Sequence, residues 1–213
     1  MRDALVAGHF DSKAVGWDAD AGKHELAADI VRAVQREIGG SIRPRLLDYG
    51  AGTGLCSMAL APRCSSILAV DISSGMLSRL EQQARAAEIC HLKTLRHDLC
   101  TGPLDGMRFD VILCAMTLHH VRNTGLLLRR FRSMLEPEGF LAIADLDQED
   151  GSFHTDPTGV EHKGFSRDHL VRQMMDAGFT LVSMETVHRV EKPGRTGPQR
   201  YPVFFTTGRM RVS

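Results

Sequence analysis

The sequence has no excess of either charge, because 26 lysines and arginines balance 26 aspartates and glutamates. Binding to a nucleic-acid backbone requires clustered basic residues, and no basic stripe is present. Long hydrophobic runs are also missing, so neither a signal peptide nor a membrane span is predicted. We therefore expect a cytoplasmic protein that has no nucleic-acid partner and does not enter a membrane.

Cysteines and aromatic residues are few. The five cysteines are an odd number and include no C-x-x-C pair, which argues against a disulfide framework and against a thiolate metal site. One tryptophan and an aromatic content of 6% do not indicate an aromatic substrate box. We therefore expect a protein whose thiols are reduced.

A glycine-rich turn follows the first strongly apolar stretch. Residues 46–55 read LLDYGAGTGL, in which a strand runs into Asp48 and then into Gly50, Gly52 and Gly54 before a helix begins. Glycine has no Cβ, so such a turn can bring its backbone close to a ligand. A second apolar strand ends in Asp71, 21 residues after Gly50, about where an acidic group meets ribose hydroxyls.

The spacing D-x-G-x-G-x-G resembles the first motif of the class I S-adenosylmethionine-dependent methyltransferases. The resemblance continues through Asp98-Leu99, residues 109–112 and residues 135–140, and it covers roughly residues 40–146. It implies S-adenosyl-L-methionine as the cofactor. It also implies that the glycine turn holds the methionine part of the cofactor and that Asp71 binds the ribose.

The same resemblance implies an adenine site in which Ile72 and Leu99 sandwich the ring and Asp98 takes its amino group. The complete implied set of cofactor-binding residues is Asp48, Gly50, Ala51, Gly52, Gly54, Asp71, Ile72, Asp98, Leu99 and Ala115.

Apolar runs alternate with helical patterns, which predicts an α/β fold: a doubly wound, Rossmann-like, mostly parallel seven-stranded sheet with helices on both faces and a C-terminal antiparallel hairpin. We expect one domain over residues 1–213, with a helical lid (1–40), a cofactor-binding core (41–146) and an acceptor-side region with the hairpin (147–213). Helical periodicity extends to Leu135, and a strand is predicted from Phe140 to Leu146. The segment 191–200, rich in glycine, proline and charge, is predicted to be a flexible surface loop.

Two adjacent histidines, His119 and His120, follow the strand predicted for residues 109–115. An imidazole with an ordinary pKa of about 6.5 can act as a base at neutral pH. Neighbouring side chains point in different directions, so we expect one ring to face the methyl acceptor, with His119 favoured because it comes first after the strand. The other reading is that both rings pack in their loop. Trp17, Phe153 and His154 are expected in the acceptor pocket.

The loop after residue 146 is rich in carboxylates and histidines but has no regular metal-ligand spacing, so no metal is predicted. The leading function is methyl transfer to a small molecule. A cofactor-binding module without catalysis remains an alternative, as does a nicotinamide-dependent oxidoreductase, although no Tyr-x-x-x-Lys pair is present. The acceptor, the atom methylated and the oligomeric state are left open.

Overall fold

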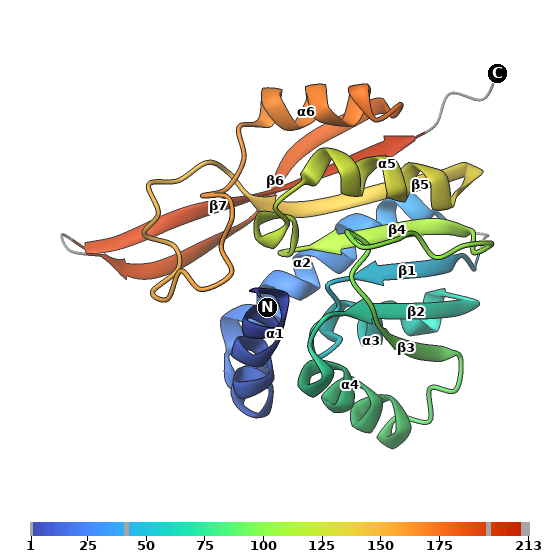
Figure 1. Ribbon diagram of the computed structural model, residues 1–213, viewed down its shortest axis with the longest axis horizontal. Coiled ribbons are helices and arrows are strands. Elements are labelled where there is room, and N and C mark those ends of the chain that lie inside the picture. The colour runs from blue at the N-terminus through green and yellow to red at the C-terminus, as the bar shows by residue number, and fades with distance from the viewer. Residues whose placement is uncertain (1, 41–42, 195–196, 210–213) are drawn as a thin grey trace.

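A seven-stranded sheet forms the centre of the molecule (Figure 1). The computed structural model describes residues 2–40, 43–194 and 197–209. The strands lie in the order β3-β2-β1-β4-β5-β7-β6; the first five are parallel, and β7 pairs antiparallel with β5 and with β6. Their bounds are β1 Arg45–Tyr49, β2 Ser66–Asp71, β3 Leu92–Arg96, β4 Phe109–Ala115, β5 Leu135–Leu146, β6 Thr180–Gly194 and β7 Gly197–Arg209.

Helices cover both faces of the sheet, and the predicted doubly wound fold is confirmed. α2 (Ala21–Ile38) and α3 (Leu55–Leu60) pack on one face, and α5 (Thr124–Met134) and α6 (Arg167–Asp176) pack on the other. Central strands buried on both faces are expected to be apolar, as β4 is apart from Asp110. Within β1, Leu46 packs into the first layer and Leu47 into the second, so consecutive side chains serve opposite cores.

The strand order reverses between β1 and β4. The chain moves outward from β1 through β2 to β3, then returns to the other side of β1 to form β4 and β5. In open sheets of this kind, ligands bind beside the carboxyl ends of the strands at such a reversal. The glycine turn after β1 lies at this position.

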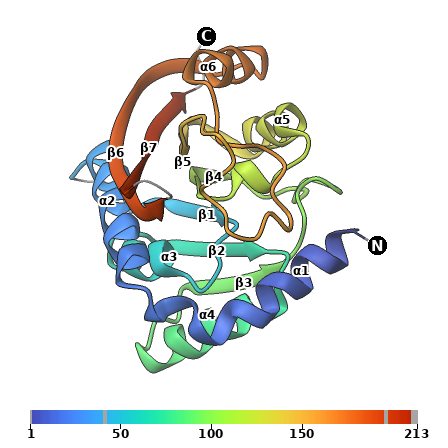
Figure 2. The ribbon, with the colours of Figure 1, turned by 90° about the vertical axis from the view of Figure 1, so that its left-hand side faces the viewer.

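The N-terminal segment is fastened to the core by two carboxylates. It consists of α1 (Arg2–Lys13) and a 3₁₀ helix, η1 (Ala14–Ala19), and α1 runs beside α4 (Ser74–Ala86), as Figure 2 shows. Asp11 accepts hydrogen bonds from Ser73 Oγ at 2.6 Å and from the Gly75 amide at 2.7 Å, at the start of α4. Asp18 accepts one from Thr53 Oγ1 at 2.6 Å.

Strand β5 begins earlier than predicted. The helix before it ends at Met134, and Leu135 is already extended and pairs with Phe109. The pairing register then shifts between Phe109 and Val111. This irregularity accommodates Pro137, which has no amide hydrogen to donate to a regular ladder.

The C-terminal hairpin is longer than predicted. Part of the segment 191–200, expected as a flexible loop, continues the two strands as far as Gly194 and from Gly197, while residues 195–196 lie outside the described residues. The part of β7 that precedes Val203 has no pairing with β5, and there the ribbon projects past the sheet (Figure 1). A two-stranded ribbon tolerates prolines, because their missing donors need not face a partner strand.

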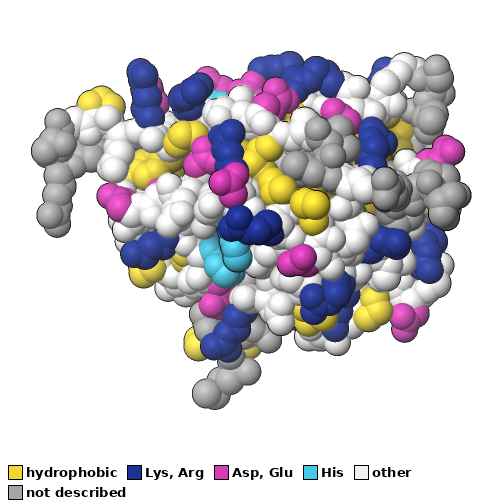
Figure 3. Space-filling view, turned by 90° about the horizontal axis from the view of Figure 1, so that it is seen from above, with side chains coloured by type: hydrophobic (Ala, Val, Ile, Leu, Met, Phe, Trp, Pro, Cys, Tyr) yellow, Lys and Arg dark blue, Asp and Glu magenta, His cyan; other side chains and the backbone are white. Residues whose placement is uncertain are grey.

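Charges of both signs are mixed over the face shown in Figure 3, where dark blue and magenta side chains alternate without forming a broad basic band. Among the described helices, none combines the length and the hydropathy needed to cross a bilayer.

Candidate functional site

A cavity of about 570 Å³ opens beside the carboxyl ends of β1, β2 and β4. This volume lies in the range of roughly 300–1,000 Å³ that small-molecule sites occupy. Its walls come from the N-terminal segment, the glycine turn, the ends of these strands and the segment after β4. The residues used below are Phe10, Trp17, Lys23, Asp48, Gly50, Ala51, Gly52, Asp71, Ile72, Asp98, Cys100, Thr101, Ala115, Thr117, His120, Arg122 and Glu161.

The glycine turn cannot accept side chains at its two ends. Gly50 and Gly54 have φ values of +74° and +88°, which L residues rarely adopt. A Cβ on Gly50 would lie 2.2 Å from Thr117, and one on Gly54 would lie 2.1 Å from Leu80. At Gly52, with φ +56°, a Cβ would meet no atom within 4 Å. Thr117 and Leu80 therefore fill the space beside Gly50 and Gly54, whereas the space beside Gly52 is open next to the cavity.

Asp71 holds the turn in place and also lines the cavity. Its Oδ2 accepts a hydrogen bond from the Gly52 amide at 2.8 Å, and its Oδ1 accepts one from the Ser73 amide at 2.8 Å. Burial raises the pKa of Asp71, and the backbone amides oppose that effect. Each carboxylate oxygen retains a second lone pair for a ligand hydroxyl.

Asp48 lies beneath the turn and is 2% exposed. Ser57 Oγ donates to its Oδ2 at 2.6 Å. Burial raises the pKa of Asp48 to about 6, although the Ser57 hydroxyl favours the ionised form. A positively charged ligand in the cavity would stabilise the carboxylate further.

The adenine assignments divide into two groups. Asp98 lines the cavity and is oriented by Tyr49 Oη at 3.2 Å and by the Cys100 amide at 2.7 Å. Ile72 also lines it. Leu99 is fully buried in the core beside β1 and β4 and does not line the cavity, whereas Cys100 does. Leu99 therefore supports this wall from behind, because the chain turns at Asp98 and directs the next side chain inward.

The N-terminal segment contributes an aromatic wall that includes Phe10 and Trp17. Their rings pack edge to face, with centroids 6.1 Å apart, and Lys23 Nζ lies 3.5 Å from the Trp17 ring centroid. Burial lowers the pKa of Lys23. Sequence reasoning identified Trp17 but missed Lys23, which looks like an ordinary charge in the first turn of a helix.

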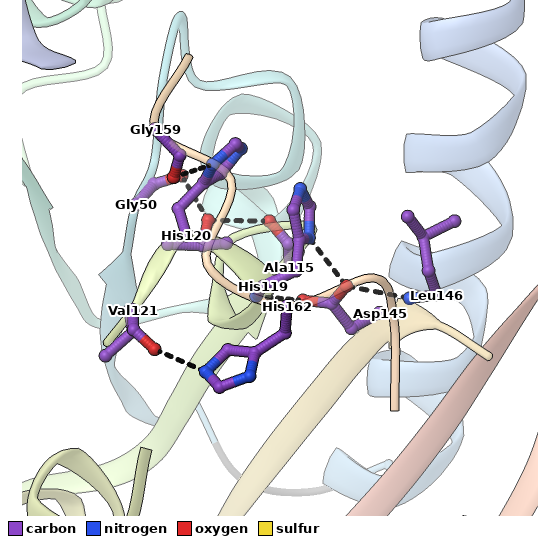
Figure 4. A network of polar contacts seen from close by, with 10 residues as sticks. Gly50, Ala115, His119, His120, Val121, Asp145, Leu146, Gly159 and His162 are labelled. Carbon is purple, nitrogen blue, oxygen red and sulfur yellow. Dashed lines mark hydrogen bonds and ion pairs between the residues drawn. The ribbon is translucent and has the colours of Figure 1, made fainter. Parts of the chain in front are cut away.

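The two adjacent histidines occupy different environments, and the preference for His119 is corrected. Both lie on η3 (Leu118–His120), but only His120 lines the cavity. His119 is 1% exposed and turns toward β5, where its Nδ1 lies 2.7 Å from Oδ1 of Asp145 (Figure 4). A tight 3₁₀ turn directs consecutive side chains differently, so order along the chain did not predict which one faces the cavity.

His120 is held as a neutral ring. Its Nδ1 lies 2.9 Å from the Gly159 carbonyl, so this nitrogen carries the donated hydrogen, and its ring packs against Phe10 with centroids 5.2 Å apart. Burial first, and then the neighbouring His119, lower the pKa of His120 to about 3. A base this weak gains little driving force for proton transfer at neutral pH.

Of the other residues expected in the acceptor pocket, Phe153 and His154 lie outside the cavity lining. Phe153 packs against Tyr201, with ring centroids 5.2 Å apart. The ring of His154 lies 4.9 Å from that of His119 and 5.6 Å from that of His120. The loop after β5 thus adds a third imidazole behind the cavity wall.

Comparison with known proteins agrees with this arrangement. A methyltransferase domain family model matches residues 47–143. An uncharacterized methyltransferase of Schizosaccharomyces pombe is 31% identical over 150 residues, which are 63% of this chain and 53% of that protein. The chain spans about half the length of the curated relatives it matches, with 53%, 49% and 48% of the first three covered.

Solved structures share the fold at low sequence identity. An S-adenosylmethionine-dependent methyltransferase from Aquifex aeolicus gives a TM-score of 0.71 at 21% identity, covering 93% of this chain and 97% of that one. The DhpI–SAH complex gives a TM-score of 0.72 at 19% identity, covering 100% and 98%. The matched segment contains the glycine turn and the central strands around the cavity. These similarities support a relationship of this chain to the class I S-adenosylmethionine-dependent methyltransferase family.

Proposed function

We propose that this protein binds S-adenosylmethionine in the cavity and methylates a small molecule. The observation that carries the proposal is that one cavity joins the open backbone at Gly52 to the carboxylates of Asp48, Asp71 and Asp98. When bound, S-adenosylmethionine supplies a methyl group that the positive sulfonium already activates. The DhpI structure, with the same fold, is a complex with SAH.

The residues present fit this cofactor. Asp71 can accept hydrogen bonds from two ribose hydroxyls, because both of its oxygens have spare lone pairs. Asp48 places a negative charge next to the turn, which suits a cationic ligand. The proposed contacts are Asp48, Gly50, Ala51, Gly52, Asp71, Ile72, Asp98 and Ala115. Gly54 contributes indirectly, because its missing side chain lets the turn pack against Leu80. Leu99 contributes indirectly by packing in the core behind Asp98.

The acceptor is a small molecule, because Phe10 and Trp17 of the N-terminal segment form part of the cavity wall. These rings exclude water, and His120 with Arg122 and Glu161 adds polar groups on the wall after β4. Methyl transfer from an activated donor depends chiefly on alignment of the reactants, which the residues lining the cavity can provide. We infer that His120 positions the acceptor rather than removing its proton, and that His119 positions its neighbour from behind.

Titration calorimetry on the full chain tests the cofactor assignment. S-adenosylmethionine and S-adenosylhomocysteine should bind, and NAD should not. Asp71→Ala removes charge-assisted hydrogen bonds worth roughly 1.5–3 kcal/mol each, so the affinity of the variant for S-adenosylmethionine should fall by at least about tenfold. Asp105→Ala, in an exposed loop away from the cavity, is the matched control. Unchanged affinity in Asp71→Ala, or preferential binding of NAD, contradicts the proposal.

A methyl-transfer screen separates the enzyme from a binding module. The full chain is incubated with labelled S-adenosylmethionine and a panel of small molecules that carry a hydroxyl group, an amine, a thiol or an acidic carbon. Transfer to any of them supports an enzyme. Binding with no transfer to the whole panel favours the cofactor-binding module.

A further inference from the structure

Three histidines from two distant segments gather behind the cavity wall. His119 and His120 come from η3, and His154 comes from the loop between β5 and α6. One ring nitrogen from each lies within 4.8 Å of those of the other two. We propose that His119, His120 and His154 bind a divalent transition-metal ion, with Zn²⁺ as the reference ion.

Two of these rings present buried nitrogens that nothing satisfies. Nε2 of His119 and Nε2 of His154 are buried and have no hydrogen-bond partner in the described part of the chain. His119 is 1% exposed, so bulk solvent does not reach this atom. Buried polar atoms in native proteins are normally bonded, and an orphaned pair beside a third imidazole calls for a ligand.

The second ring nitrogens of His119 and His120 are engaged in the way that metal-binding histidines require. Nδ1 of His119 bonds to Asp145, and Nδ1 of His120 bonds to the Gly159 carbonyl, as Figure 4 shows. Such outer partners set the tautomer and leave Nε2 with its lone pair toward the ion. Asp145 is itself held, because its Oδ1 accepts a hydrogen bond from the Leu146 amide at 2.7 Å and its Oδ2 accepts one from the His119 amide at 3.2 Å.

The loop that carries His154 is fastened over η3. The amides of Glu161 and His162 both donate to the His119 carbonyl, at 2.9 and 3.0 Å. The ring of His162 bonds through Nε2 to the Val121 carbonyl at 2.9 Å. These contacts keep the three imidazoles together and lower the entropy lost when an ion binds.

The ligand chemistry selects the class of ion. Imidazole suits Zn²⁺, Cu²⁺, Ni²⁺ and Fe²⁺, whereas Mg²⁺ and Ca²⁺ prefer oxygen. Neutral rings are the binding form. Two nitrogens on one tetrahedral zinc ion at about 2.0–2.1 Å are about 3.4 Å apart, so the three rings, whose nitrogens lie within 4.8 Å of one another, must close by up to about 1.4 Å.

Three histidines leave one coordination position for a water or a substrate oxygen, as in catalytic zinc sites. His120 lines the cavity, so that position can be reached from it. The metal site goes beyond the proposed methyl transfer and does not depend on it, because its test is metal binding and needs no cofactor.

The test uses the metal-stripped full chain, titrated with Zn²⁺ by calorimetry and with Co²⁺ by visible spectroscopy. One ion should bind per chain, with a Co²⁺ spectrum that lacks thiolate bands. His154→Ala and His120→Ala should each weaken binding by more than the roughly 10–100-fold typical of losing an outer partner, and Asp145→Asn by about that amount. His154 lies on a loop and His120 on the cavity wall, so these variants keep the test valid if changes at the buried His119 or Asp145 prevent folding.

Two control variants sharpen the result. His169→Ala removes a histidine from the exposed side of α6 and should leave affinity unchanged, and Cys90→Ser removes the exposed thiol. The proposal is overturned if the parent binds no Zn²⁺, if folded His120→Ala and His154→Ala bind as tightly as the parent, or if Cys90→Ser abolishes binding. S-adenosylmethionine binding is measured separately, so failure of one proposal is distinct from failure of the other.

Discussion

Nδ1 of His119 lies 2.7 Å from Oδ1 of Asp145, and the two side chains are 2% and 0% exposed. The pair joins η3 to β5 across the carboxyl edge of the sheet. Burial alone would raise the pKa of Asp145, but His119 and backbone amides outweigh it, and the pKa lies below its usual range. The pair is therefore a structural support for the wall that carries His120.

Removing one partner should destabilise the fold strongly. Asp145→Ala leaves the His119 ring and amide without an acceptor in a buried site, so we expect a loss of about 3–5 kcal/mol in the free energy of unfolding, measured in urea. Asp145→Asn should cost less, because its amide oxygen can still accept one bond. Asp105→Ala, at an exposed position, should change stability by less than about 0.5 kcal/mol. An Asp145→Ala variant as stable as this control would contradict the assignment.

Asp48 should make stability depend on pH near neutrality. Its pKa is about 6 in the folded protein against 3.8 ordinarily, so the folded state retains a proton that the unfolded chain releases. Its contribution is therefore complete below about pH 4 and is lost as pH rises through about 6, a change of about 3 kcal/mol at about 1.4 kcal/mol per pKa unit.

The comparison with Asp48→Asn isolates that effect. The difference in unfolding free energy between the parent and Asp48→Asn should shift toward the variant between about pH 4 and about pH 7. S-adenosylmethionine, which carries a sulfonium charge, should also bind more tightly as pH rises over this interval, and S-adenosylhomocysteine should respond less. A pH-independent difference would show that Asp48 titrates normally.

Alanine substitutions in the glycine turn should separate two causes of lost stability, which are steric clash with a neighbouring side chain and strain of the left-handed backbone. Gly50→Ala places a Cβ 2.2 Å from Thr117 at a φ of +74°, so both a clash and a strained backbone arise. Gly52→Ala has space and should cost only the roughly 1–2 kcal/mol of a left-handed conformation. Thermal unfolding should therefore rank Gly50→Ala below Gly52→Ala, with Gly102→Ala near the parent because nothing lies within 4 Å of its Cβ. Equal losses at Gly50 and Gly52 would exclude the clash with Thr117.

Deletion of residues 1–18 tests the lid. Phe10 and Trp17 line the cavity, while Asp11 and Asp18 tie the segment to α4 and Thr53. We expect the truncated chain to keep its far-ultraviolet circular dichroism and to bind S-adenosylmethionine more weakly, because the cavity is no longer closed. The double variant Phe10→Ala/Trp17→Ala, with the segment retained, should show a smaller loss. Unfolding of the truncated chain would mean that the segment belongs to the core.

Local patterns predicted the central part of the fold well. The strand before the glycine turn, the strand ending in Asp71 and the strand over residues 109–115 are found as β1, β2 and β4, because each is an apolar run ended by a turn or a carboxylate. The hairpin was predicted too short, since prolines that usually interrupt a strand are tolerated in a ribbon without further neighbours. The early start of β5 depended on pairing with Phe109, which lies far away in the sequence.

The sequence by itself determined the glycine turn, its two carboxylates Asp48 and Asp71, and the alternation that builds the sheet, because spacing along one strand–turn–helix unit sets their relative positions. Only the tertiary structure decided which of the adjacent histidines faces the cavity and that Leu99 supports its wall from behind. It also decided that His154 joins His119 and His120, 34 residues later in the chain than His120. Those relationships depend on how the loop after β5 packs over η3, and contacts between distant segments leave no periodic trace in the sequence.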